Sequence, residues 1–195
     1  MQIEHHNTCA IILAGGAGQR VGGQNKGLLK FQGRALIEHV VERVEPQVAE
    51  LVISANRDTE KYQEYSKNVV GDAQTSYQGP IAGILASLKA IQHQKNIAAA
   101  LICTCDTPKL PQTLFTRLNA ALKHRGELIS VAHDGNRTQN LHCLMRREAW
   151  PSLLEFYNNG GRAMHRWYNE IELIEVSFSD QPEAFFNINV LSELS

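Results

Sequence analysis

Glycines and cationic side chains gather near the start of the chain, where no carboxylate opposes them. Within nine residues the sequence has five glycines, which are Gly15, Gly16, Gly18, Gly22 and Gly23. No Asp or Glu occurs between positions 9 and 37, and the cations there are Arg20, Lys26, Lys30 and Arg34. Glycine lets a ligand approach the bare backbone, and clustered amide N–H groups make a concavity that suits anions. The stretch therefore predicts a binding site for a phosphorylated ligand.

Two aspartates could act together with this loop. Asp72 and Asp106 each follow an apolar run of the kind that forms a buried strand. In open α/β sheets, ligands bind beyond the carboxyl ends of the strands. If the ligand is a nucleoside triphosphate, it brings Mg²⁺, a hard cation that prefers carboxylate and phosphate oxygens. Asp106 is the better candidate for the metal ligand, because Pro108 fixes the loop that follows it.

The elements that must position these groups alternate between strand and helix patterns. Strands are predicted at 9–14, 51–55, 68–71, 98–105, 128–132, 141–145 and 171–178, with a last extended piece at 185–189. Helices are predicted at 35–44, after an N-cap at Asp58 or Thr59, at 79–93, at 112–124, and from 148 and 161. This alternation is typical of an α/β fold with an open, mostly parallel sheet and helices on both faces. The turn signal Asp134-Gly135 predicts one antiparallel strand.

Composition limits the class of protein. The 195 residues are 43% hydrophobic and 20% charged, with a net charge of −1, which predicts one ordinary globular domain over 1–195. No apolar run approaches the ~18 residues that span a bilayer, and the N-terminus lacks a signal-peptide layout. The four cysteines form no C-x-x-C pair, so we expect reduced thiols and a cytoplasmic location. A pI near 6.7 argues against a nucleic-acid partner.

The loop differs from the two best-known phosphate-binding motifs. The dinucleotide fingerprint G-x-G-x-x-G fails because Val21 stands where the third glycine is needed. The P-loop pattern also fails, because Asn25 precedes Lys26 and Gly27 replaces the Ser or Thr that would bind magnesium.

What remains is Leu13-Ala-Gly-Gly-x-x-x-Arg20-x-Gly22-x-x-x-Lys26-x-Leu-Leu. This segment resembles the signature of nucleotidyltransferases, and its Leu-Ala-Gly-Gly resembles the molybdenum cofactor guanylyltransferases, the MobA family. Three further segments are similar to motifs of that family: Gly79-Pro80-Ile-Ala-Gly83, Cys105-Asp-Thr-Pro108 and Asn187-Ile-Asn189. The resemblance implies a three-layer, Rossmann-like nucleotidyltransferase fold. It also implies transfer of GMP from GTP to the terminal phosphate of molybdopterin or its molybdenum form, with release of pyrophosphate.

The resemblance also assigns roles to individual residues. It implies that Arg20, Lys26 and Asp106 are catalytic, that Asp106 binds Mg²⁺, and that Asn187 and Asn189 lie near the metal on the molybdopterin side. The GTP-binding residues that it implies are Leu13, Ala14, Gly15, Gly16, Lys26, Ser54, Asp72, Gly79, Pro80, Gly83 and Asp106. The attacking phosphate is already ionised near neutral pH, so no general base is expected. The scattered histidines, His142 among them, are interpreted as surface or core imidazoles. Further expected partners are other molybdenum cofactor biosynthesis proteins and cofactor-accepting enzymes.

Three positions depart from the family pattern. Asn25 stands where the family usually has Asp, Val21 where it has Met, and Ser54 where relatives have asparagine. We expect Asn25 to change how Lys26 is held, and Ser54 to change one base or ribose contact. The alternatives are a molybdopterin cytidylyltransferase, a sugar-phosphate nucleotidyltransferase, and a nucleotide-binding regulator that has lost catalysis. The cytidylyl relatives tend to have Leu-Ala-Ala-Gly, so Gly15-Gly16 favours the guanylyl family.

Overall fold

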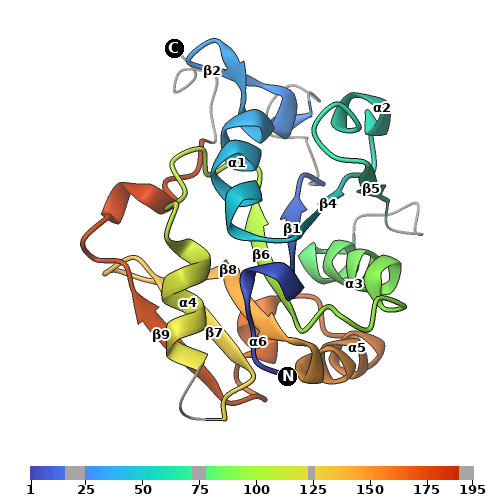
Figure 1. Cartoon of the computed structure of the whole chain (residues 1–195), viewed down its shortest axis with the longest axis vertical. Helices are drawn as coiled ribbons and strands as arrows, with labels where there is room; N and C mark the ends of the chain where they lie inside the picture. The colour runs from blue at the N-terminus through green and yellow to red at the C-terminus, as the bar shows by residue number, and fades with distance from the viewer. Residues whose placement is uncertain (16–24, 72–77, 123–125, 189–195) are drawn as a thin grey trace.

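A single seven-stranded sheet forms the centre of the molecule in the computed structural model, which describes residues 1–15, 25–71, 78–122 and 126–188 (Figure 1). Its strand order is β5-β4-β1-β6-β8-β7-β9. The strands are β1 (Thr8–Leu13), β4 (Glu50–Ser54), β5 (Asn68–Val70), β6 (Ala99–Thr104), β7 (Ile129–His133), β8 (Thr138–Arg146) and β9 (Leu173–Ser177). This agrees with the predicted strands, whose ends differ by at most three residues.

The sheet is parallel on one side of β8 and mixed around it. β1 pairs in parallel with β4 and β6, and β4 pairs in parallel with β5. β8 runs antiparallel to both β6 and β7, whereas β9 is parallel to β7. The turn before β8 forms where it was predicted, because one carboxylate oxygen of Asp134 accepts the N–H groups of Asn136 and Arg137. The prediction of a mostly parallel sheet with one antiparallel strand is confirmed.

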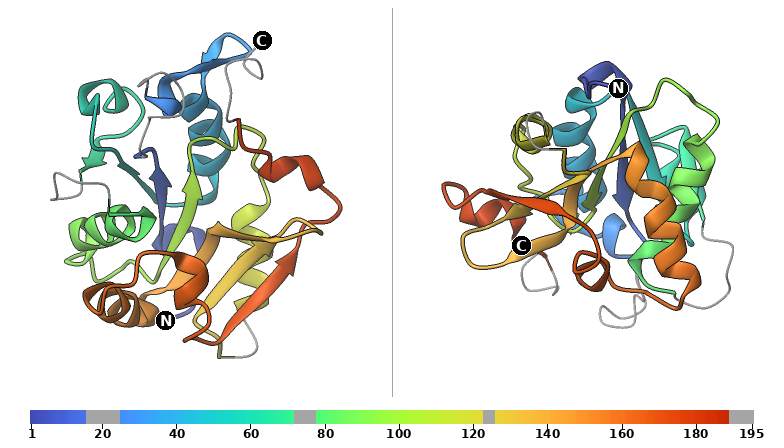
Figure 2. Two further views of the ribbon diagram at one scale, coloured as in Figure 1. Left: turned by 180° about the vertical axis from the view of Figure 1, so that it is seen from behind. Right: turned by 90° about the horizontal axis from the view of Figure 1, so that it is seen from below.

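Helices cover both faces of the sheet, as the right-hand view of Figure 2 shows. Along β1, Ala10 and Ile12 join the apolar cluster under α1 (Leu36–Val44) and α4 (Leu114–Leu122). Ile11 and Leu13 point the other way, into the cluster under α3 (Pro80–Ile91), α5 (Trp150–Asn158) and α6 (Met164–Trp167). Successive side chains of a strand face opposite sides, so one strand that is apolar throughout supplies two cores.

Short elements complete the described chain. The 3-10 helices are η1 (His5–Asn7), η3 (Lys26–Leu28), η4 (Glu45–Gln47), η5 (Arg147–Ala149) and η6 (Pro182–Phe185). A second, two-stranded sheet pairs β2 (Lys30–Phe31) with β3 (Arg34–Ala35), and α2 (Thr59–Tyr62) follows β4. The expected extended piece at 185–189 is wrong at its start, because Phe185 ends η6. Asp58 does occupy the N-cap position of α2, but with left-handed backbone and no capping hydrogen bond from its side chain.

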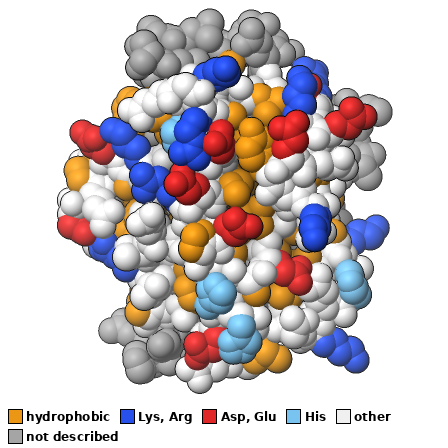
Figure 3. Space-filling model, turned by 45° about the horizontal axis from the view of Figure 1, so that its top comes forward, with side chains coloured by type: hydrophobic (Ala, Val, Ile, Leu, Met, Phe, Trp, Pro, Cys, Tyr) orange, Lys and Arg blue, Asp and Glu red, His pale blue; other side chains and the backbone are white. Residues whose placement is uncertain are grey.

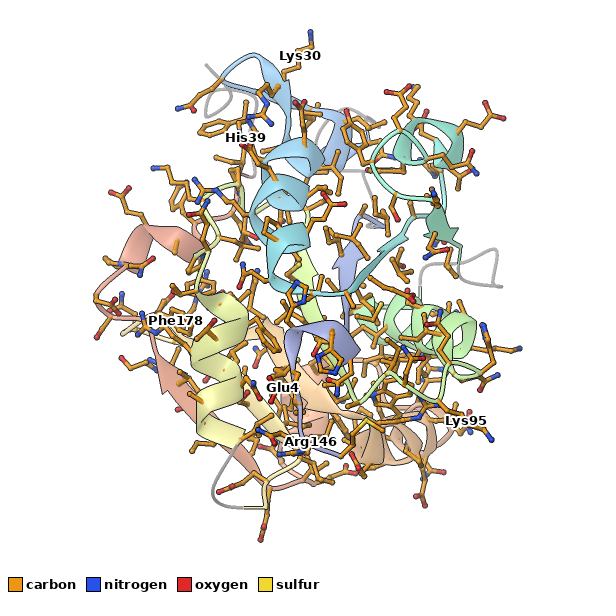
Figure 4. All side chains as sticks on the ribbon, viewed as in Figure 1. Glu4, Lys30, His39, Lys95, Arg146 and Phe178 are labelled. Carbon is orange, nitrogen blue, oxygen red and sulfur yellow. The ribbon has the colours of Figure 1, made fainter. Side chains whose placement is uncertain are left out.

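The small sheet directs two of the cations of the opening stretch away from the main sheet. Lys30 lies on β2 and points outward from the body of the molecule (Figure 4). Arg34 forms ion pairs with Glu38 and Glu42 of α1, at 2.7 and 2.9 Å. Among the lysines and arginines of residues 25–35, only Lys26 is therefore directed toward the carboxyl edge of the main sheet.

The segment after β9 returns across the sheet toward β6. Phe178 packs beside α4 (Figure 4), with the Arg117 guanidinium 4.0 Å from the centre of its ring. Phe178 also contacts Phe185 edge to face, at 5.3 Å between ring centres. The backbone N–H of Ile188 then donates to the carbonyl of Asp106 at 2.9 Å. The aromatic contacts thus bring residues 185–188 to the end of β6.

The surface carries both signs of charge. On the face in Figure 3, blue and red side chains of the described residues are interspersed, in keeping with the net charge of −1. None of the described helices combines the length and the apolar character that a membrane crossing requires. The single-domain organisation stays a prediction, and one sheet that takes strands from residues 8 to 177 supports it.

Candidate active site

Backbone hydrogen bonds bring the carboxyl ends of four strands together at one edge of the sheet. The N–H of Ala14 donates to the carbonyl of Ser54 at 2.8 Å, and the N–H of Cys105 donates to that of Leu13 at 3.1 Å. On the far side of β4, the N–H of Ala55 donates to the carbonyl of Val70 at 2.9 Å. The residues that follow β1, β4, β5 and β6 therefore share one edge, which is where open α/β sheets bind ligands.

A small pocket opens at this edge, between the strands and the start of α3. Its lining residues are Leu13, Gly15, Ser54, Asn56, Gly79, Pro80 and Gly83. Six of the seven were predicted to bind GTP, and Asn56 was not. The pocket lies at the N-terminus of α3, where backbone N–H groups without helical partners favour anionic or polar ligands.

Two glycines are required by the way α3 begins. Gly79, the residue before the helix, has φ +82°, and a Cβ there would lie 2.8 Å from the carbonyl oxygen of Arg162. A Cβ on Gly83 would lie 2.5 Å from the Ser54 Oγ. Any larger side chain at position 83 would push the helix away from β4. Gly79 therefore lets the chain pass close to Arg162 where α3 begins, and Gly83 lets the helix approach the end of β4 closely.

Lys26 and Asp106 form an ion pair next to this pocket. The Lys26 Nζ lies 2.6 Å from Asp106 Oδ2, with 25% and 16% of the two side chains exposed. The two residues are 80 positions apart in the sequence. Lys26 lies on η3 and Asp106 follows β6, so the pair connects the end of the glycine-rich stretch to the central sheet. A cation and a carboxylate side by side can hold a phosphate and a metal ion.

The second oxygen of Asp106 is held by a buried network. Thr104 donates its hydroxyl to Asp106 Oδ1 at 2.6 Å. Thr107 donates its own hydroxyl to the carbonyl of Thr104 at 3.0 Å. The Nε2 of His142, on β8, lies 3.1 Å from Thr107 Oγ1 and 3.5 Å from Thr104 Oγ1. The antiparallel strand therefore brings a histidine to the site, behind the carboxylate.

The network assigns the tautomer of His142. Both threonine hydroxyls already donate elsewhere, so Nε2 must carry the proton that they accept. Nδ1 is then a bare acceptor, and it has no hydrogen-bond partner among the described residues. Burial lowers the pKa of His142 from its ordinary 6.5 to about 4, and the Asp106 carboxylate opposes part of that shift. His142 is thus a neutral donor at physiological pH, in edge contact with Phe185.

The structure brings most of the predicted site residues to this edge. Lys26, Asp106 and the predicted pocket residues lie there, and the hydrogen bond of Ile188 to Asp106 brings Asn187 beside them. Ala14 lies at the end of β1 and contacts Ser54 through its backbone. Arg20, Gly16, Asp72 and Asn189 lie outside the described residues, so their roles stay predictions. The functional roles of the other predicted residues stay predictions too.

Sequence reasoning missed Thr104, Thr107 and the contact of His142 with them. The sequence places Asn56 just past a strand end, where ligands are expected, but it was not assigned to GTP. Thr104 and Thr107 flank Asp106 so closely that a search for hydroxyl donors would have found them. His142 is a core imidazole, as interpreted, but nothing local in its strand indicates the site, because strand pairing alone brings it there.

An α/β sheet with a pocket and a lysine–carboxylate pair at its carboxyl edge defines a nucleotide-binding α/β protein. Residues 10–173 match the family model described as the MobA-like NTP transferase domain. The chain belongs to this family, and it is a nucleotidyltransferase.

Curated relatives and solved structures agree with this membership. A molybdenum cofactor guanylyltransferase of Shewanella sp. (strain MR-4) is 39% identical over 180 residues, which cover 92% of this chain and 89% of that protein. One of Shewanella halifaxensis (strain HAW-EB4) is 38% identical, covering 92% and 88%. The crystal structure of molybdopterin-guanine dinucleotide biosynthesis protein A from Archaeoglobus fulgidus superimposes with a TM-score of 0.75 at 22% identity, covering 96% of this chain and 94% of that one. The last comparison supports the fold.

Proposed function

We propose that this protein transfers GMP from GTP to the terminal phosphate of molybdopterin, or of its molybdenum form, and releases pyrophosphate. The observation that carries the proposal is the Lys26–Asp106 pair, 2.6 Å apart, beside a pocket at the carboxyl edge of the sheet. The identity of the base and of the acceptor comes from the relatives, whose name is molybdenum cofactor guanylyltransferase.

The surroundings of Asp106 suit a hard cation, which we propose to be Mg²⁺. Next to the carboxylate, the hydroxyl of Thr104 offers a further oxygen, and the backbone of Ile188, which follows Asn187, is bonded to the Asp106 carbonyl. Burial raises the pKa of the adjacent Cys105 thiol, so it stays protonated and is no thiolate ligand. The described residues contain no group of three or more His, Cys, Asp or Glu side chains that could hold a metal. The remaining ligands would be phosphate oxygens and water, as Mg²⁺ usually retains.

The reaction needs positioning and charge neutralisation more than covalent catalysis. An oxygen of the acceptor phosphate forms a bond to the α-phosphorus of GTP, and the bond from that phosphorus to the oxygen that bridges to the β-phosphorus breaks. Pyrophosphate leaves with the electron pair. The acceptor is already ionised, so the protein removes no proton. When bound, the metal ion neutralises charge on the phosphate oxygens.

The protein's own groups have separate parts in this proposal. Lys26 moves its ammonium toward the leaving phosphates, while Arg20 acts from the glycine-rich stretch. Asp106 holds the cation, and Thr104 orients its carboxylate. The pocket of Ser54, Asn56 and Pro80 receives the nucleoside. Asn187 and Asn189 contact the acceptor side.

A cytoplasmic location is part of the proposal. All four cysteines are free and buried, as in proteins that live in a reducing compartment. Proteins that deliver molybdopterin and enzymes that accept the finished cofactor are the proposed partners.

The test is a turnover assay on the whole chain with GTP, Mg²⁺ and molybdopterin, measuring pyrophosphate and the dinucleotide product by mass. We expect product with GTP, none with ATP, and loss of product in Asp106→Ala. Product from CTP in place of GTP would make the protein a cytidylyltransferase with the same mechanism. GTP binding without pyrophosphate release, at any acceptor concentration, would contradict catalysis and favour a regulator.

A further inference from the structure

The side chain of Asn25 joins the start of η3 to α2. Tyr62, at the end of α2, donates its hydroxyl to Asn25 Oδ1 at 2.5 Å. The Asn25 Nδ2 donates to the carbonyl of Arg57 and to Asp58 Oδ2, each at 3.3 Å. Asn25 is the residue before Lys26. The side-chain amide of Asn25 thus links the residue before Lys26 to three residues that lie more than 30 positions away in the sequence.

The partners of Asn25 are themselves fixed. Tyr62 is fully buried in the main core, and burial raises its pKa, so it remains a hydroxyl donor. Asp58 is held by Lys61, whose Nζ lies 2.8 Å from Asp58 Oδ1. The hydrogen bonds from Lys61 and Asn25 keep the pKa of Asp58 below its ordinary value, so Asp58 is a carboxylate at neutral pH.

An amide matches the atoms around position 25, whereas a carboxylate does not. The amide oxygen meets the Tyr62 hydroxyl, which is a donor, and the amide nitrogen meets two acceptors. In Asn25→Asp, the atom facing Arg57 and Asp58 would be an oxygen. It would then lie about 3.3 Å from a carbonyl oxygen and from an ionised carboxylate. Like charges at that distance repel each other even in water.

The contacts of Asn25 bear directly on Lys26. Gly27, on the other side of Lys26 in the sequence, also lies against Tyr62. A Cβ on Gly27 would lie 2.4 Å from the Tyr62 hydroxyl and 3.2 Å from the Cys105 Sγ. Tyr62 therefore touches both neighbours of Lys26, and the backbone between them has little room to shift. The Lys26 side chain extends from this constrained stretch of backbone and pairs with Asp106.

We propose that Asn25, Tyr62 and Asp58 form a clamp that positions Lys26, and that positions 25 and 58 are electrostatically coupled, so that an amide is required at 25 while 58 is a carboxylate. These are positioning residues that act through Lys26. The inference rests on the proposed function, since it assigns a role at the same site.

The experiment is a double-mutant cycle on the full chain, read by the dissociation constant of Mg·GTP in calorimetry and by kcat/KM. Asn25→Asp is expected to weaken GTP binding about tenfold, the size of a close charge repulsion in water. Adding Asp58→Asn should restore the affinity to within about threefold of wild type, because the carboxylate at 25 then meets an amide donor.

Two matched variants separate the clamp from a general charge effect. Glu60→Gln removes one negative charge from the same short helix, at an exposed residue that is not one of the hydrogen-bond partners of Asn25. It should not rescue Asn25→Asp. Asn25→Ala removes the hydrogen bonds without adding charge, so it should weaken GTP binding, and Asp58→Asn should not restore it. Equal rescue by Glu60→Gln and Asp58→Asn would overturn the coupling.

The outcomes distinguish this inference from the proposed function. If wild type binds no GTP and forms no product, the proposed function fails. The coupling between positions 25 and 58 is then measured from the thermal unfolding of wild type, Asn25→Asp, Asp58→Asn and the double variant. If wild type binds GTP but Asn25→Asp binds it equally well, the clamp is wrong. Should Asn25→Asp not fold, Asn25→Ala decides, and wild-type affinity in that variant would rule the clamp out.

Discussion

Asp106 follows a strand in the middle of the sheet, whereas Lys26 lies on a three-residue helix outside it. The two side chains meet at 2.6 Å and are similarly shielded from solvent, at 16% and 25% exposed. They differ in their support. Asp106 is backed by Thr104, which contacts His142, and both lie on strands of the main sheet. Lys26 depends on the contacts that Tyr62 makes with its two neighbours in the chain, Asn25 and Gly27.

The difference separates two ways of building a site. The carboxylate half is positioned by the pairing of β6 and β8 in the main sheet. The lysine half is set by a few contacts of a three-residue helix and its cap with Tyr62 and Cys105. We therefore expect that changes around Lys26 affect function more than folding, and that changes under Asp106 affect both. The predictions that follow test this contrast, in order of their expected effect on turnover.

Asp106→Asn should cause the largest loss. The amide keeps the size of the side chain but removes the charge that holds the metal and pairs with Lys26. Removing one preorganised electrostatic group typically lowers kcat by roughly 10²–10³-fold. The measurement is pyrophosphate release at saturating GTP, with the thermal midpoint as the control for folding. Turnover within tenfold of wild type would show that Asp106 is not the metal ligand.

Gly27→Ala tests the lysine half. The added methyl collides with the Tyr62 hydroxyl, so η3 must move and Lys26 with it. We expect kcat/KM to fall by roughly 10–100-fold, since a misplacement of about 1 Å has effects of this order. Adding Tyr62→Phe removes the colliding oxygen together with its hydrogen bond to Asn25, so we expect only part of the loss to be recovered. If the double variant is no better than Gly27→Ala alone, the Tyr62 contact is not what limits the position of η3.

Thr104→Val tests the carboxylate half in a matched way. The substitution keeps the shape of the side chain and removes the hydroxyl that donates to Asp106 Oδ1 at 2.6 Å. A hydrogen bond to a charged group contributes about 1.5–3 kcal/mol, so we expect about a tenfold loss of kcat together with lower stability. Thr104→Ser keeps the hydroxyl and serves as the control. If the free energy of unfolding of Thr104→Val, measured in urea, equals that of wild type, the proposed contrast between the carboxylate half and the lysine half is wrong.

Strand positions and their ends could be predicted because the relevant signals are local. Apolar runs located β1, β4 and β6, and the carboxyl ends of parallel strands share an edge, so Gly15, Ser54 and Asp106 were expected at the same edge of the sheet. The glycine-rich stretch pointed to Lys26 because a cation followed it closely. These inferences needed no knowledge of the order of the strands.

The support of the site could not be predicted, because it depends on pairing between distant segments. His142 reaches Thr104 and Thr107, next to Asp106, only because β8 pairs with β6, and an isolated histidine in an apolar strand gives no sign of that. The contact of Asn25 with Tyr62 spans 37 positions and depends on a four-residue helix. Arg34 was expected to add to the cationic field, but the small sheet places it against Glu38 and Glu42 instead.

His142→Phe should change turnover least and acid stability most. The imidazole is neutral in the folded protein, with a pKa lowered to about 4 by burial, whereas in the unfolded chain it is near 6.5. The unfolded state therefore binds the proton first. The stability that wild type has above pH 6.5 is lost as the pH falls toward 4, by up to a few kcal/mol.

Phenylalanine fills the site beside Phe185 without a titrating group. Urea unfolding at pH 7 and pH 4 should show a smaller loss for His142→Phe than for wild type, and kcat at pH 7.5 should fall only a few-fold. If wild type and His142→Phe lose the same amount of stability between pH 7 and pH 4, then His142 is not neutral in the folded protein.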